Sequence, residues 1–302
     1  MLANLTGLDS ETYLNVVQAA INAQEASFPS FRTIQGPPRE TDIYASPSCS
    51  VRHSAYLIAL RQEIWSVLLY RRPFRLPLGP DNDYTQLEPA DDFVWTNRII
   101  LWCADVLRFC FGGANVTPGH DDTYATGVER WDLLKTFEQS WDSLQPPCFK
   151  PLYYEEPNPT GGKYFPKICH MNDCQVLGLQ HVELARMLLA VYNPRRQRLG
   201  LGASALNHAL ESQLQRSTLR LCGLALFNKK CQATMVTAAV GVSMCGEYFY
   251  DAGEQTAIVD FMKILEDEHA WPTQTVVSAL RDAWNLRRIS YSAYVPRDPS
   301  ST

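Results

Sequence analysis

The 302-residue sequence predicts an all-α fold, a single large multi-helix domain with long irregular connections. Apolar residues recur at spacings of three and four along most of the chain, which is the pattern of one helix face. No run alternates convincingly between apolar and polar residues, as a half-buried strand would. Hydrophobic residues make up 46% of the chain, which is enough apolar material for one large core.

The helical segments follow from this periodicity and from residues that start and stop helices. They are expected over about 10–25, 50–70, 93–111, 128–144, 173–193, 204–227, 234–248, 258–265 and 273–284. Ser10 is an N-cap residue for the first helix. Pro73 stops the second, because proline disfavours helix in the residue before it. Asp91 suits the N-terminus of the third, which Gly112 closes.

The remaining elements are placed in the same way. The fourth segment has the clearest apolar stripe, formed by Val128, Trp131, Leu134, Phe137, Trp141 and Leu144. A Pro- and Tyr-rich connection with little periodicity follows over 146–167. The segment 234–248 is apolar on nearly all sides, so we expect it to be the central buried helix. Thr273 caps the last helix, and the large aromatic Trp284 anchors it on the core.

These segments divide the chain into three parts. Residues 1–48 are expected to hold an N-terminal helix and a linker, residues 49–290 the helical domain, and residues 291–302 a flexible tail. Arg72, Arg75 and Arg98 are expected to pair with Asp91, Asp92 or Glu63 at the surface, where each pair contributes under about 1 kcal/mol.

Composition limits the classes of partner and the compartment. The formal net charge is -5, whereas a domain that binds nucleic acid by itself is expected to be basic. No two of the nine cysteines are separated by two residues, which argues against a zinc ribbon and suits a reducing compartment. The N-terminus does not resemble a signal peptide, and no apolar run reaches eighteen residues, so no membrane contact is expected.

Several catalytic and metal-binding patterns are incomplete. The run from Gly241 to Cys245 has Cys in place of the second Gly of a nucleophile elbow, and helix is predicted on both sides. Glu266 and His269 have the spacing of a di-iron ligand pair but no second copy. Cys169, His170 and Cys174 lie close together without an evident fourth zinc ligand. The sequence therefore predicts neither an enzyme nor a metal or cofactor.

Four groups of residues occur in a distinctive order between about residues 50 and 290. They are Leu60–Trp65 with Arg72–Leu78, then Asp91–Ile100 with Phe109–Gly112, then Trp131 and Trp141 with Pro147–Leu152 and Phe165–Ile168, and finally Ala270–Thr273 with Leu280 and Trp284. This arrangement resembles the regulatory domain that follows the zinc binuclear cluster in many fungal transcription factors. The six-cysteine cluster of that family is absent, so the chain is either a fragment of a longer factor or a shortened member that works through partners.

The resemblance implies an α-helical nuclear domain, with a cytosolic pool left open, that regulates RNA polymerase II transcription. In some relatives a hydrophobic small molecule controls such a domain. The implied partners are that ligand and the transcription machinery or another subunit of the same factor, with no direct DNA contact. Two alternatives stay open: a helical scaffold or oligomerisation protein without ligand, including a homodimer, and, less favoured, an enzyme acting on a hydrophobic small molecule.

If a ligand binds, the segment 235–249 is the best candidate wall, because it is apolar yet rich in small residues. The candidate ligand-binding residues are Met235, Ala239, Val242, Ser243, Cys245 and Phe249. The rival interpretation is that the same small residues let a neighbouring helix approach closely.

Overall fold

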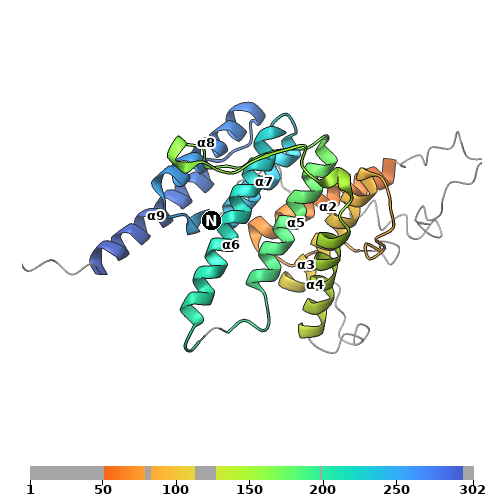
Figure 1. Cartoon of the computed structure of the whole chain (residues 1–302), viewed down its shortest axis with the longest axis horizontal. Coiled ribbons are helices and arrows are strands. Elements are labelled where there is room, and N and C mark those ends of the chain that lie inside the picture. The colour runs from red at the N-terminus through yellow and green to blue at the C-terminus, as the bar shows by residue number, and fades with distance from the viewer. Residues whose placement is uncertain (1–50, 79–82, 113–126, 198, 295–302) are drawn as a thin grey trace, which may run out of the picture.

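The computed structural model describes residues 51–78, 83–112, 127–197 and 199–294. The predicted helix over 10–25 lies outside these ranges. The described helices are α2 (Val51–Tyr70), α3 (Asp92–Phe111), α4 (Gly127–Leu144), α5 (Asp173–Val191), α6 (Ala203–Phe227), α7 (Gln232–Cys245), α8 (Ala252–His269) and α9 (Gln274–Tyr294). They form one packed domain, so the predicted all-α class is confirmed (Figure 1).

Local signals at the helix ends act largely as predicted. The Asp91 carboxylate accepts a hydrogen bond from the Val94 amide at 2.8 Å, and Gly112 ends α3 in a positive-φ conformation at 78°. Thr273 precedes α9, but its hydroxyl donates to the Glu266 carboxylate at 2.7 Å and so ties α9 to the end of α8. Helix α9 also continues to Tyr294, four residues into the segment that was predicted to be a tail.

Helix α7 is the central helix, and this prediction is also correct. Every residue from Thr234 to Val242 is buried. In Figure 1, α7 lies beside α6, and its neighbours in space also include α2, α5 and α8. Over these nine residues the helix can be apolar around its whole circumference, because none of its faces there meets water.

The crossing of α3 and α5 is the most extensive helix contact. It is close because Gly178 lies in α5 at the crossing point. A methyl group on Gly178 would stand 3.1 to 3.3 Å from Phe149, Thr96 and Ile99, which already fill the space above it. Ring contacts extend this core, since the centroid of Trp141 lies 5.8 Å from that of Trp95 and 5.2 Å from that of Phe149.

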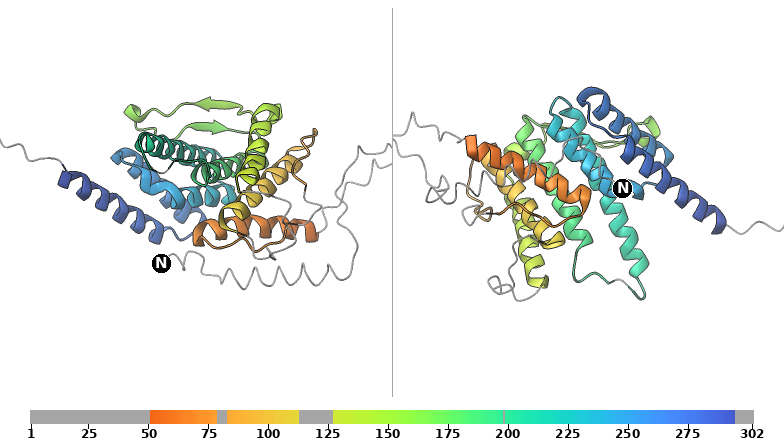
Figure 2. Two further views of the ribbon diagram at one scale, coloured as in Figure 1. Left: turned by 90° about the horizontal axis from the view of Figure 1, so that it is seen from below. Right: turned by 180° about the vertical axis from the view of Figure 1, so that it is seen from behind.

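The connection between α4 and α5 contains a β-hairpin that the sequence analysis missed. Strands β1 (Tyr153–Glu155) and β2 (Lys167–Cys169) pair antiparallel, and the short 3-10 turns η1 (Pro147–Phe149) and η2 (Pro159–Gly161) flank β1. Figure 2 shows the hairpin lying across the helices. Its returning arm rests on α6, where the Pro166 backbone occupies the space that a side chain on Gly223 would need.

A predicted surface ion pair is buried instead. Glu63 on α2 is fully buried and accepts two hydrogen bonds from the Arg72 guanidinium, at 2.7 and 2.6 Å. The same carboxylate accepts the Arg75 amide at 2.6 Å, so it fixes the chain that leaves α2. Arg98 donates to the Glu88 carbonyl and stacks on Trp95. Among the described residues no ion pair joins its side chain to Asp91, Asp92 or Glu63, although burial lowers its pKa and the Asp91 charge slightly opposes this shift.

Candidate functional site

The six predicted ligand-binding residues do not share one surface. Four of them, Met235, Val242, Cys245 and Phe249, are between 0% and 4% exposed and belong to the core. Ala239 and Ser243, one helical turn apart on α7, line a small pocket. The structure therefore brings only these two predicted residues together at a space.

The pocket lies between four helices and is almost entirely apolar. Its other lining residues are Leu69 on α2, Val236 and Val240 on α7, Met262 on α8, Trp271 and Pro272 between α8 and α9, and Val276 on α9. The space is about 10 Å³, which is at most one water molecule. The Ser243 hydroxyl already donates its proton to the Ala239 carbonyl at 2.8 Å. It can therefore act toward the pocket only as a hydrogen-bond acceptor.

Close packing explains part of the small-residue content of the segment 235–249. A methyl group on Gly241 would collide with Leu221 of α6, and one on Gly246 would lie 2.8 Å from Leu280 of α9. Small residues here let two neighbouring helices approach. Burial also raises the pKa of the Cys245 thiol to about 12, which keeps it in the unreactive protonated form.

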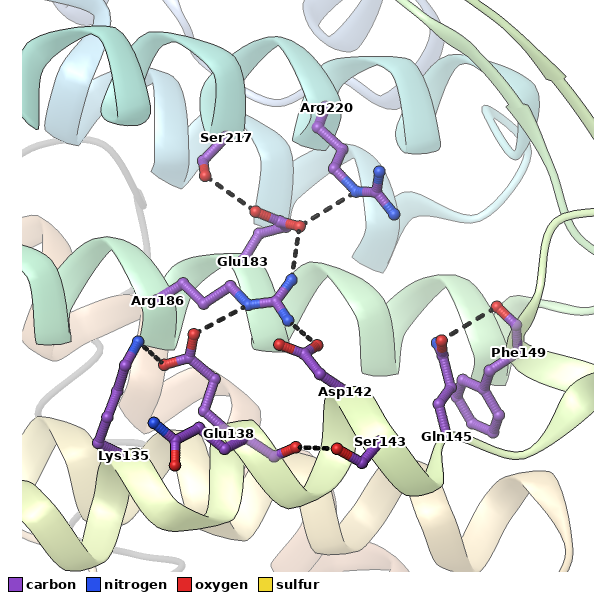
Figure 3. A network of polar contacts seen from close by, with 11 residues as sticks. Lys135, Glu138, Asp142, Ser143, Gln145, Phe149, Glu183, Arg186, Ser217 and Arg220 are labelled. Carbon is purple, nitrogen blue, oxygen red and sulfur yellow. Dashed lines mark hydrogen bonds and ion pairs between the residues drawn. The ribbon is translucent and has the colours of Figure 1, made fainter. Parts of the chain in front are cut away.

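A polar network that the sequence analysis missed joins α4, α5 and α6 (Figure 3). At its centre the Glu183 carboxylate accepts a hydrogen bond from the Ser217 hydroxyl at 2.9 Å. Its other oxygen lies 3.1 Å from Arg220 Nε and 3.4 Å from Arg186 Nη1. Glu183 is 7% exposed at its side chain, so these partners replace the water that it loses on folding.

Arg186 connects this centre to α4. Its Nε lies 3.3 Å from the Glu138 carboxylate, and its guanidinium also contacts Asp142. Glu138 pairs in turn with Lys135 at 2.7 Å. Burial lowers the pKa of Arg186, but the three surrounding carboxylates outweigh it and raise that pKa overall. Three carboxylates and three cations thus balance where α4, α5 and α6 meet.

The chemistry of this network is that of a structural clamp. Each carboxylate is paired with a cation, and the Ser217 hydroxyl is buried and donates to Glu183. Two of its pairs, Lys135 with Glu138 and Glu183 with Arg186, have the i,i+3 spacing of neighbours on a helix surface. Each spacing can be read from the sequence, but the contact between the two pairs, through Arg186 and Glu138, cannot.

Two buried histidines belong to no such network. His181 is fully buried, with Nδ1 2.7 Å from the Leu177 carbonyl, and burial lowers its pKa to about 4. Burial and the nearby Arg220 charge lower the pKa of His170 in the same way, also to about 4. Within the described ranges no three His, Cys, Asp or Glu side chains are placed to hold a metal ion together. No helix in those ranges is long and apolar enough to cross a bilayer.

The chain is thus a single packed helical domain with a small hairpin, a small and largely apolar pocket, and a charge-balanced clamp between α4, α5 and α6. Comparisons with models of known protein families, with curated proteins and with solved structures find no match to this chain.

Proposed function

We propose that this chain is the regulatory domain of a fungal transcription factor, acting in the nucleus on RNA polymerase II transcription through partners. The observation that carries the proposal is the convergence of the segments on which the resemblance rests. Trp95 comes from the second segment, and Trp141 and Phe149 come from the third. Their rings pack in one cluster with centroids 5.8 and 5.2 Å apart.

Because residues from separate segments of the resemblance pack together, the resemblance is better explained by a common fold than by chance matches in each segment. In the first segment, Glu63 binds Arg72 and the Arg75 amide, so its two halves form one unit. In the fourth, the Trp284 indole donates to the Gly246 carbonyl at 2.9 Å and holds α9 against the end of α7. The residues on which the resemblance rests thus hold parts of the fold together, as residues common to a family of domains are expected to do.

The proposal assigns DNA contact to a partner or to another part of the factor. The net charge of -5 and the absence of paired Cys-x-x-Cys ligands motivate this assignment. A ligand-responsive form of regulation would require the pocket beside Ala239 and Ser243 to open, because about 10 Å³ holds no organic molecule.

A tethering experiment tests the proposal. The full chain is fused to a heterologous DNA-binding domain, and transcription of a reporter with matching sites is measured in a fungal cell. We expect the fusion to change reporter output at least severalfold. Leu134→Ala, which truncates a buried side chain of α4, should abolish the change, whereas Leu133→Ala, 53% exposed on the same helix, should not. A folded fusion that leaves the reporter unchanged would contradict the proposal.

A scaffold or oligomerisation protein is the second candidate, and one surface favours it. Leu199 and Leu201, which precede α6, are 85% and 99% exposed, and Leu206 in its first turns is 47% exposed. Exposed leucines grouped in this way are typical of contact surfaces. A molar mass that rises with concentration and returns to the monomer value in Leu201→Glu would favour this function. An unchanged monomer mass across concentrations would exclude homo-oligomerisation.

A further inference from the structure

One face of α2 is only partly covered by the described residues. Ile58 is 43% exposed, and Arg61, Gln62 and Trp65 are half-buried. These four residues recur at spacings of three and four, so they form a single stripe along the helix, which we call the α2 outer face. Trp65 anchors its far end, because the indole donates to the Thr237 hydroxyl of α7 at 3.2 Å.

Arg61 gives this face a positive charge that no carboxylate of the described residues is seen to compensate. Burial lowers the pKa of its guanidinium, and the thiols of Cys174 and Cys231 oppose this shift only in part. No ion pair or hydrogen bond to the Arg61 side chain is found among the described residues. A partly buried cation without a carboxylate partner lacks the compensation that burial of charge normally requires.

The chain itself supplies a segment with the complementary properties. Residues 1–25 contain three acidic side chains, Asp9, Glu11 and Glu25, and no lysine, arginine or histidine. The helix predicted over 10–25 has Leu14, Val17 and Ile21 on one face. A helix of this length is marginal in water on its own and is normally stabilised by packing its apolar face.

The lengths of the predicted helix, the α2 outer face and the linker between them are compatible with such a contact. A 16-residue helix is about 24 Å long, and the twelve positions of α2 from 54 to 65 span about 18 Å. The linker 26–50 joins the segment directly to the start of α2, and its 25 residues reach up to roughly 80 Å when extended. The linker is therefore long enough for the segment to turn back along α2.

We propose that the N-terminal segment 10–25 docks as an amphipathic helix on the α2 outer face, with Leu14, Val17 and Ile21 toward Ile58 and Trp65 and an acidic side chain beside Arg61. The contact is intramolecular. It covers the exposed side chain of Ile58 and gives Arg61 a carboxylate partner.

Photo-cross-linking of the full chain tests this directly. A photoreactive amino acid replaces Ile58, and in a matched control it replaces Leu133, an exposed leucine of α4. We expect monomer-mass products from the Ile58 probe, with cross-linked peptides that map to residues 10–25 and with a yield independent of concentration. Dimer-mass products would show that a second copy occupies the face, and a yield no greater than that of the control would show an open face. Either result overturns the proposal.

Charge reversal supplies the second readout. In the Ile58 probe background, Arg61→Glu should lower the cross-link yield roughly threefold at low salt, and added salt should lower the yield of the unmodified chain. Arg216→Glu, on an exposed position of α6, is the matched control and should leave the yield unchanged. Circular dichroism of each variant shows that the helices are retained. Equal effects of the two reversals would overturn the role of Arg61 and with it the proposed register.

Discussion

The contact between Gly223 and Pro166 allows a sharp test of how the hairpin is held. An alanine at position 223 would place its methyl carbon 2.9 Å from Pro166 Cγ and closer still to the Pro166 carbonyl oxygen. Ordinary contact begins near 3.4 Å, so the proline ring would have to retreat by about 0.5 Å and its carbonyl by more. The obstacle is backbone, which cannot rotate away as the end of a flexible side chain can.

The expected magnitude is the balance of two opposing effects. Overpacking a well-filled contact costs about 1–3 kcal/mol. Replacing glycine by alanine within a helix contributes about 1 kcal/mol in the other direction. We therefore expect Gly223→Ala to lower the free energy of unfolding by up to about 2 kcal/mol. The backbone amides of the hairpin should exchange with solvent faster, because the arm that carries the buried Ile168 is displaced.

The control is the same substitution at an open position. Gly127 begins α4, and a methyl group there would meet nothing within 4 Å. Gly127→Ala should leave stability unchanged or raise it by up to about 1 kcal/mol. Urea unfolding of both variants at one pH, with hydrogen exchange over 153–169, measures the difference. A Gly223→Ala protein as stable as the native chain, with unchanged exchange, would refute the claim that the hairpin packs rigidly on α6.

Three further outcomes are expected. Trp284→Ala should lower the free energy of unfolding by about 3–5 kcal/mol, as for other buried aromatic truncations, and an unchanged unfolding midpoint would show that α9 is loosely attached. Ala239→Leu should cost about 1–3 kcal/mol, because the space beside it is about 10 Å³, and a neutral result would instead show a pocket that opens readily. Between pH 6.5 and about 4 the unfolded chain binds a proton at His181 that the folded chain does not, so stability should fall by up to about 3 kcal/mol as the pH drops through this range. Urea midpoints measured against pH should lose this part of their slope in His181→Gln, and an identical slope would mean that His181 is not held neutral.

The helices were predictable because their signals are local. Apolar spacing, the Asp91 cap and the positive-φ Gly112 all act within a few residues of the element that they define. The hairpin was missed because three-residue strands are too short to show alternation, and β2 is held by α6, a helix more than thirty residues further along the chain. A contact between segments so far apart in the sequence leaves no local pattern from which it could be predicted.

Periodicity and cap residues were enough to predict the helices α2 to α9 and the buried position of α7. They were not enough to predict what the buried residues surround, which depends on how the helices pack. Met235 and Val242 are as apolar as a pocket wall requires, yet they face neighbouring helices, while Ala239 and Ser243 meet the small space that remains. The reason is geometric: period and composition specify which face of a helix is buried, but the crossing of the helices decides whether that face meets another side chain or a void.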